Sequence, residues 1–300
     1  MSKFKASIKS MRLRTLPLSC GGVILGILLA AADFKVRFPV AVLIVLTTVC
    51  LQVLSNLSNE LGDMLHGTDT PERQGPDYGM KAGLTVKDMK RLIGLFVVLC
   101  IISGTAMTWL SFGTLWDLTP IMILLLGGAA ILAAMKYTLG RNPYGYRGLG
   151  DLYVFIFFGI VAVAGAYFVA AHDLFWRILL PGAAVGCFGI GVLNVNNIRD
   201  MKTDAVNRRT VALRLGLNGA RIYQTVLIAL GWIFMAAYCL IRIPDPRHWL
   251  WALTLPLYII HLRGVWTRAD RALDPMLPLL VMSTFLFDIL AGLGFVIYLF

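Results

Sequence analysis

The chain has 300 residues, of which 58% are hydrophobic and only 14% are charged, and its formal net charge is +11. Soluble domains use apolar residues at nearer half of all positions, so this composition excludes an ordinary soluble protein. The charged residues gather in short stretches between long apolar runs that show no two-residue alternation. This pattern favours membrane-spanning helices over a transmembrane barrel. The basic residues are spread over short loops, so nothing indicates nucleic-acid binding.

In chain order, the apolar runs predict an all-α membrane protein with about nine spans. We place them at 15–33, 38–59, 91–111, 118–138, 152–171, 178–197, 222–241, 248–262 and 277–300. The eighth span is the weakest, because it is short and contains Pro256. No clear small-residue cleavage site follows the first apolar run, so we expect a retained span rather than a signal peptide. Residues 1–300 are expected to form a single polytopic domain.

The distribution of basic residues predicts the orientation of these spans. Of the 27 lysines and arginines, 22 lie in the N-terminal segment or in the loops that follow spans two, four, six and eight. Lys and Arg collect on the cytoplasmic side of membrane proteins. We therefore expect a cytoplasmic N-terminus, an external C-terminus and a multi-pass protein of the cytoplasmic (inner) membrane, whose basic face meets membrane lipid.

Two polar stripes begin before their apolar spans have ended. Asn56, Asn59 and Asp63, at the end of the second span, have helical spacings that place them on one face, provided that the helix continues through Asp63. The same spacing recurs at the end of the sixth span, in Asn197, Asp200 and Asp204. Polar solvated helix ends would explain one such stripe. Two matched stripes on the same predicted side of the membrane indicate a functional site.

The oxygen-bearing side chains of these stripes are hard ligands that suit Mg²⁺. Basic residues follow both stripes, among them Arg73 and Lys81 after the first and Arg199, Lys202, Arg208 and Arg209 after the second. Arginine and lysine bind phosphate oxygens, so the pattern predicts a metal-assisted site for a diphosphate group.

The loop after the fourth span, residues 136–151, contains three tyrosines, three basic residues and four glycines. Such a loop is suited either to closing over an aromatic acid or to forming a tight interfacial turn with tyrosine anchors. Both interpretations stay open from the residues alone.

At these residues the chain resembles the UbiA-type intramembrane prenyltransferases over nearly its whole length. The segments that carry the resemblance are Asn56–Asp63 with Asp69, the loop 137–151, and Asn196–Asp200 with Asp204. The form Asn-Asn-x-Arg-Asp favours the branch that prenylates 1,4-dihydroxy-2-naphthoate in menaquinone synthesis. Two positions depart from the general family pattern: Glu60 stands where Asp is usual, and Asn196-Asn197 replace a Tyr-Asp pair.

The resemblance implies roles for particular residues. Two Mg²⁺ sites would be formed by Asn59, Asp63 and Asp69, and by Asn197, Asp200 and Asp204. The diphosphate would contact Arg73, Lys81, Arg199 and Lys202. The aromatic acceptor would be bound by Asn56, Asn196, Lys136, Tyr144, Tyr146 and Arg147.

The reaction that the resemblance implies is Mg²⁺-dependent transfer of a polyprenyl group from polyprenyl diphosphate to 1,4-dihydroxy-2-naphthoate. Diphosphate and CO₂ would leave, giving demethylmenaquinone. Two alternatives remain at this point. One is the same chemistry with another acceptor, such as hydroxybenzoate, homogentisate or a lipid alcohol. The other is a membrane transporter, for which polar residues nearer the bilayer midplane would be typical.

Overall fold

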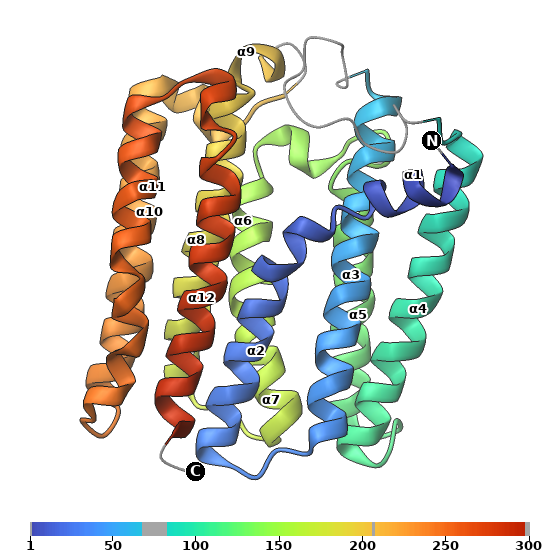
Figure 1. The fold of residues 1–300 in the computed structure, drawn as a ribbon. Helices are drawn as coiled ribbons and strands as arrows, with labels where there is room; N and C mark the ends of the chain where they lie inside the picture. The colour runs from blue at the N-terminus through green and yellow to red at the C-terminus, as the bar shows by residue number, and fades with distance from the viewer. Residues whose placement is uncertain (1, 68–82, 206–207, 298–300) are drawn as a thin grey trace.

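The computed structural model describes residues 2–67, 83–205 and 208–297, and within these ranges the chain is helical without a strand (Figure 1). Eight segments are long and apolar enough to cross a bilayer, as far as the described ranges go. They are Lys3–Asp33, Phe38–Leu65, Val86–Phe112, Leu118–Lys136, Gly150–Ala171, Trp176–Arg199, Val211–Ile241 and Asp270–Val296. The prediction of an all-α membrane protein is confirmed, whereas the count of nine and the orientation of the termini stay predictions.

The predicted eighth span is not among these segments. It is divided into a 3₁₀ helix, η5 (Pro246–Thr254), and the α-helix α11 (Leu255–Thr267). Pro256 lies at the start of α11, where a proline is tolerated because the first N–H groups of a helix have no intrahelical partner. The break therefore follows from the proline that made this span the weakest in the sequence.

The remaining elements follow the apolar runs, with local signals at their ends. The first segment consists of α1 (Lys3–Ser10), η1 (Leu13–Thr15) and α2 (Leu16–Asp33). It is followed by α3 (Phe38–Leu65), α4 (Val86–Phe112) and α5 (Leu118–Lys136). Pro17 and Pro39 lie in the first turns of α2 and α3. Thr85 and Asp88 form a reciprocal capping box that starts α4.

The second half of the chain begins with η2 (Tyr144–Arg147), α6 (Gly150–Val154), the π-helical segment η3 (Phe155–Gly165) and α7 (Ala166–Ala171). It continues with α8 (Leu179–Arg199), the short α9 (Met201–Asp204), α10 (Val211–Ile241), η5, α11 and α12 (Met276–Val296). Thr210 caps α10, which is interrupted at Gly216, where φ is +68°. α10 begins 11 residues before the predicted 222 because the cap, rather than the apolar run, sets its start.

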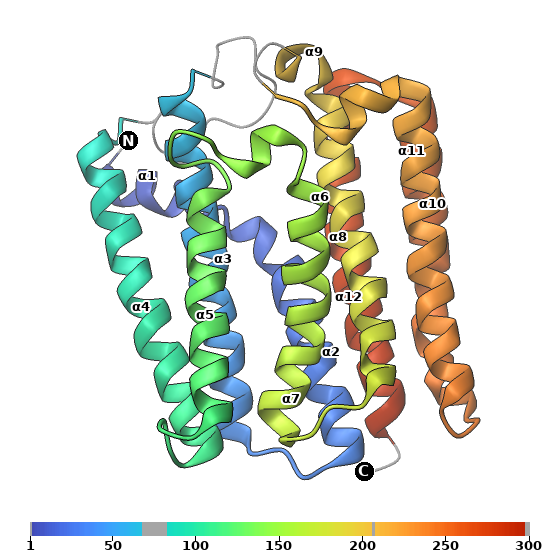
Figure 2. The same cartoon turned by 180° about the vertical axis from the view of Figure 1, so that it is seen from behind.

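The helices form two groups with a central pair between them. Figures 1 and 2 show α3, α4 and α5 on one side, α8, α10, α11 and α12 on the other, and α2 with the α6–α7 segment in the middle. Helices α1 and α9 lie at one end of the bundle, and α12 ends at the opposite end. Each group has its own buried apolar cluster. Phe188, Trp251, Tyr258 and Phe287 belong to the larger one, and Leu54, Leu57 and Leu61 to the other.

The segment η3 packs closely on α8 through glycines. A Cβ atom at Gly159 would lie 2.5 Å from the Gly186 Cα, so this contact requires glycine. The π-helical backbone is wider than an α-helix, and π segments occur often at functional sites. In this protein the residues Phe157, Phe158 and Val161 of η3 line the main cavity.

Asp288 lies in the middle of α12 and is fully buried. Its carboxyl group faces Gly21 of α2, at a distance that would leave no room for a side chain on Gly21. Neither carboxyl oxygen has a hydrogen-bond partner among the residues that the structure describes. A charge at such a depth costs a few kcal/mol, so we expect a neutral carboxylic acid.

Candidate active site

A cavity of about 980 Å³ lies between the two helix groups. Its polar end is lined by residues of α3, α8 and the loops at the end of the bundle that carries α1 and α9, among them Asn56, Asn59, Asp63, Asn196, Arg199 and Arg208. Its other walls are apolar and include Ile44, Met107, Ile123, Leu126, Phe157, Val161 and Val169. A charged mouth joined to an apolar interior suits an amphiphilic molecule with an anionic head.

The first polar stripe is carried by one continuous helix. α3 extends six residues beyond the predicted end of the second span, so Asn56, Asn59 and Asp63 lie within it, and all three line the cavity. The Asn59 side-chain oxygen accepts a hydrogen bond from the Thr138 hydroxyl at 3.3 Å. The Asp63 carboxylate accepts one from the Tyr146 hydroxyl at 2.7 Å. The loop after α5 is thereby held against the stripe on α3.

The second stripe is divided between two helices. α8 ends at Arg199, Asp200 forms the junction, and α9 carries Asp204. The Arg199 guanidinium binds the Asp200 carboxylate with two hydrogen bonds of 2.8 and 2.7 Å. Its remaining N–H groups donate to the Asn196 side chain at 2.8 Å and to Asp274 at 3.0 Å. Arg199 therefore holds Asp200 in place in this structure, and both Arg199 and Asp274 line the cavity.

Arg208 joins the two stripes. Its guanidinium lies 2.5 Å from an Asp63 carboxylate oxygen and 3.6 Å from Asp204. The Tyr146 ring lies beneath it, with its centroid 4.7 Å from the guanidinium carbon. Burial by itself would lower the pKa of Arg208, but the Asp63 and Asp204 carboxylates raise it above its ordinary value. Two carboxylates from distant parts of the chain therefore converge on one buried cation.

Other predicted site residues lie away from this point. Lys136 and Arg147 are exposed and do not line the cavity. The Lys202 side chain is 78% exposed and pairs with Asp270 at 2.8 Å. Asn197 is buried and borders a small adjacent cavity together with Tyr137 and Arg208. Asp69, Arg73 and Lys81, also predicted for the site, lie outside the described residues.

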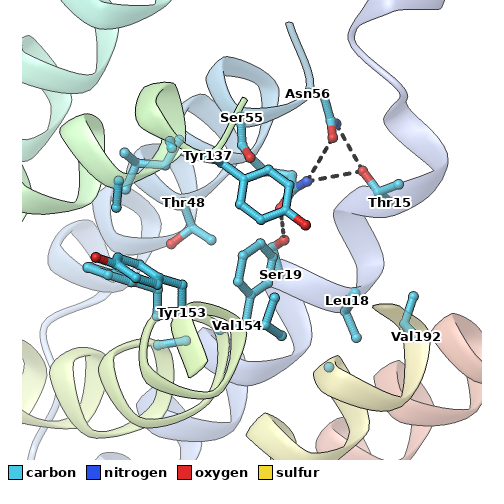
Figure 3. A pocket seen from close by; sticks show the side chains of 18 of the residues that line it. Thr15, Leu18, Ser19, Thr48, Ser55, Asn56, Tyr137, Tyr153, Val154 and Val192 are labelled. Carbon is cyan, nitrogen blue, oxygen red and sulfur yellow. Dashed lines mark hydrogen bonds between the residues drawn. The ribbon is translucent and has the colours of Figure 1, made fainter. Parts of the chain in front are cut away.

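In a polar network on the cavity wall, Asn56 was predicted for the site, whereas Gln52, Thr15 and Ser19 were not. Gln52 donates to Thr15 at 3.3 Å and to Asn56 at 3.1 Å, and it accepts a hydrogen bond from Ser19. Asn56 in turn donates to Thr15 at 3.0 Å and to the Met11 carbonyl at 2.8 Å. Figure 3 shows Thr15, Ser19 and Asn56 gathered along one side of the pocket. Gln52 and Ser19 inside apolar runs were the available signal, because polar groups within membrane spans are usually functional.

This network holds the corner between α1 and α2. Thr15 donates to the Arg12 carbonyl at 3.0 Å, and Arg12 has a left-handed backbone with φ of +49°. A non-glycine residue in this region of backbone conformation is strained, so the conformation is retained only where surrounding contacts hold it. Arg12 and Arg14, which flank this corner, both line the cavity. The network therefore fixes two further basic residues at the polar end.

A row of stacked aromatic rings lies along another wall. Tyr144 stacks on Tyr153 with ring centroids 3.8 Å apart, and Tyr153 stacks on Phe157 at 6.1 Å. All three line the cavity, and Figure 3 shows Tyr153 with Tyr137 nearby. The Tyr144 hydroxyl donates to the Ala133 carbonyl at 2.7 Å, which ties the ring to α5. Such ring faces attract a cation.

The residues present fit a divalent metal ion in their chemistry. Asn59, Asp63 and Asp204 offer the amide and carboxylate oxygens that Mg²⁺ prefers. Asp63 and Asp204 already share one positive charge, that of Arg208, so their arrangement accepts a cation. In the described ranges, no group of three or more His, Cys, Asp or Glu side chains forms a complete metal site. Mg²⁺ is often held by one or two carboxylates together with phosphate oxygens, so the described carboxylates are compatible with such a site.

Together, the fold and the cavity define a multi-pass membrane protein with a cavity that is polar and charged at one end and apolar along its other walls. Residues 20–276 match the UbiA prenyltransferase family. The chain belongs to this family, as the resemblance predicted, and it is a membrane-embedded prenyltransferase.

Similar proteins of known name cover the chain almost completely. The chain is 38% identical to the 1,4-dihydroxy-2-naphthoate octaprenyltransferase of Escherichia coli over 297 residues, which are 98% of this chain and 96% of that protein. It is 35% identical to the protein of the same name from Haemophilus influenzae, over 98% of this chain and 97% of that one.

Solved structures show the same fold. The apo structure of a UbiA homologue from Aeropyrum pernix superimposes with a TM-score of 0.68 at 17% identity and covers 100% of both chains. A UbiA homologue from Archaeoglobus fulgidus bound to GPP and Mg²⁺ gives a TM-score of 0.64 at 13% identity, over 95% of this chain and 99% of that one.

Proposed function

We propose that this chain transfers a polyprenyl group from a polyprenyl diphosphate to 1,4-dihydroxy-2-naphthoate in the cytoplasmic (inner) membrane. The observation that carries the proposal is the cavity, whose polar end is lined by Asp63 and by Arg208, which also pairs with Asp204. The naphthoate acceptor is supported by the names of the two relatives with 38% and 35% identity over nearly the full chain.

The balance of the reaction is that of a substitution with decarboxylation. The C–O bond between the prenyl group and the diphosphate breaks, and the allylic cation is attacked by the electron-rich naphthoate ring. A carbon–carbon bond forms and the ring loses its carboxylate as CO₂. The electrons of the broken bond stay with the ring and restore its aromaticity, so no net proton is released. The product is the hydroquinone form of demethylmenaquinone, so the transfer step itself needs no oxidant.

The polar end of the cavity is suited to holding the diphosphate. We assign Asn59, Asp63 and Asp204 to metal binding, and Mg²⁺, when bound, supplies charge neutralisation for the leaving group. Asn197 and Asp200 complete the second stripe, with Asp200 oriented by Arg199. The Arg208 guanidinium lies beside both carboxylates, where it can bind a phosphate oxygen.

The walls of the cavity are suited to the other two parts of the reaction. The apolar residues of α3, α5 and η3 exclude water from the prenyl chain, which protects an allylic cation from hydrolysis. The faces of Tyr144, Tyr153 and Phe157 are placed to stabilise its charge. The network around Gln52 and Asn56 offers amide and hydroxyl groups for the polar edge of an aromatic acid.

A product assay tests the proposal. Purified protein in detergent is incubated with one labelled polyprenyl diphosphate and, separately, with dihydroxynaphthoate, 4-hydroxybenzoate or homogentisate, with and without Mg²⁺. We expect a product only with dihydroxynaphthoate and Mg²⁺, and its mass should be that of the condensed pair less CO₂. A prenylated hydroxybenzoate as the main product would refute the naphthoate assignment and leave the prenyltransferase class intact.

A further inference from the structure

Arg208 has an unusual position for a cation, because it occupies the point at which the two stripes meet. Its side chain is only 8% exposed, and both of its ion-pair partners, Asp63 and Asp204, belong to the set assigned to metal binding. Its backbone N–H donates to the Asp204 carbonyl at 2.9 Å. The pairing with Asp63 spans 145 positions of the sequence, so it is a feature of the tertiary structure.

Tyr146 supports both members of this pairing. Its hydroxyl donates to the same Asp63 oxygen that Arg208 contacts, and its ring lies under the guanidinium at 4.7 Å. The Tyr146 carbonyl accepts a hydrogen bond from the backbone N–H of Arg209, the residue after Arg208, at 3.0 Å. The lone pairs of that Asp63 oxygen are therefore directed at two protein donors. A metal ion that binds this oxygen has to displace one of them.

We propose that Arg208 is a built-in placeholder for the metal, which occupies the cation position between Asp63 and Asp204 until a diphosphate arrives. The inference rests on the proposed function and concerns the order of binding at that site. Without diphosphate, a metal ion competes with a guanidinium that is already paired with both carboxylates. With diphosphate, the guanidinium gains phosphate oxygens as new partners, and Asp63 and Asp204 become available to the metal.

The placeholder makes metal and diphosphate binding cooperative. Each ligand supplies what the other needs, since diphosphate removes Arg208 from the carboxylates and the metal compensates for its loss. Coupling between two ligands typically changes affinity by about 5- to 150-fold and is reciprocal. The protein thereby avoids holding a tightly bound metal ion in the absence of diphosphate.

The test measures metal binding in the absence of any reaction. Mn²⁺ replaces Mg²⁺ as the probe, and its free concentration is read from the electron paramagnetic resonance signal, with and without inorganic pyrophosphate and corrected for the complex in solution. The variants are Arg208→Gln and, as the matched control, Arg214→Gln. Arg214 is an exposed arginine at the same end of the bundle that contributes to neither stripe.

We expect wild type and Arg214→Gln to bind Mn²⁺ weakly alone and more tightly with pyrophosphate. Arg208→Gln should bind Mn²⁺ alone on the order of tenfold more tightly than wild type, and it should lose most of the coupling. Unchanged Mn²⁺ affinity in Arg208→Gln would overturn the placeholder and leave Arg208 as a simple diphosphate ligand. A gain of the same size in Arg214→Gln would also overturn it, because the effect would then reflect net charge alone.

A measurement on wild type covers the case in which Arg208→Gln does not fold. Thermal unfolding should shift little with Mn²⁺ alone, and it should shift with Mn²⁺ and pyrophosphate together by more than the sum of the separate shifts. Equal stabilisation by Mn²⁺ alone contradicts the proposal. Neither measurement needs an acceptor. If the protein showed the coupling but did not prenylate dihydroxynaphthoate, the proposed acceptor would be wrong and the proposed role of Arg208 would stand.

Discussion

Two clusters of charge at opposite ends of the bundle have inverse compositions. At the cavity, one guanidinium (Arg208) pairs with two carboxylates, Asp63 and Asp204, and the Tyr146 hydroxyl donates to Asp63. At the other end, one carboxylate serves two guanidiniums: Asp33 lies 2.7 Å from Arg242 and 3.5 Å from Arg177, and the Tyr167 hydroxyl donates to it at 2.8 Å. The Asp33 cluster lines neither of the two cavities described above.

The difference shows which features separate a functional cluster from a structural one. Both clusters combine Asp, Arg and Tyr, so residue type alone does not distinguish them. The Asp33 cluster joins α2, α7, α10 and the segment before α8, and its charge surplus is positive. The Arg208 cluster has a negative surplus, borders a large cavity and can therefore take an additional cation. The ratio of carboxylates to guanidiniums and the access to a cavity are the two features on which we propose the site at one end of the bundle.

The largest expected effect comes from Asp63. Asp63→Asn keeps the shape of the side chain and removes the negative charge that attracts both Arg208 and a metal ion. We expect turnover with Mg²⁺ to fall by about 10²- to 10³-fold, because the metal ion that would neutralise the leaving group loses a charged ligand. The initial rate of product formation measures this effect. Asp33→Asn, measured per folded molecule, is the matched control and should retain wild-type turnover.

An equal loss of turnover in both variants would break the comparison, since Asp33 would then act on the reaction as well. Size-exclusion profiles in detergent should show both proteins to be folded before rates are compared. Asp200→Asn should also lose activity, because Arg199 would no longer hold a carboxylate at the end of α8.

The part of this site that could be predicted from the sequence is local. The stripe on α3 follows from helical spacing, because the helix continues past the apolar run through Asp63. The outward position of Lys202 could not be predicted in this way. α8 ends at Arg199 and the chain turns at Asp200, so helical spacing no longer applies. The pairing of Arg208 with Asp63 and the network of Gln52 depend on how distant helices pack, which no local pattern encodes.

The second effect concerns stability at the opposite end. Asp33→Ala leaves two largely buried guanidiniums, Arg177 and Arg242, without their shared carboxylate. Breaking a buried ion pair by removing one partner costs about 3 kcal/mol or more, and the partial exposure of this cluster sets the expectation at the low end. Thermal unfolding in detergent should show a clear decrease for Asp33→Ala. An unchanged unfolding temperature would mean that the cluster does not hold the helices together.

A smaller effect is expected from the polar network on the cavity wall. Gln52→Leu removes the partner of Ser19, Thr15 and Asn56 at once. Buried groups left without a hydrogen bond cost about 1–3 kcal/mol, so stability should decrease. Turnover should decrease as well, because the corner that carries Arg12 and Arg14 loses its support. Asp33→Ala is the contrasting variant, because we expect it to lower stability without lowering turnover per folded molecule. If Gln52→Leu kept wild-type turnover, the network would have a structural role only, like the Asp33 cluster.

The two tyrosines give the smallest and most closely matched comparison. Tyr146→Phe and Tyr167→Phe each delete one hydroxyl that donates to a carboxylate, at 2.7 Å to Asp63 and at 2.8 Å to Asp33. A hydrogen bond to a charged group contributes about 1.5–3 kcal/mol, so the two deletions start from similar energies. We expect Tyr167→Phe to lower the unfolding temperature at unchanged turnover. Tyr146→Phe should instead reduce turnover, because the loss falls on Asp63, the carboxylate that we assign to metal binding. If both variants changed only the unfolding temperature, the two clusters would be equivalent, and the cavity alone would have to distinguish them.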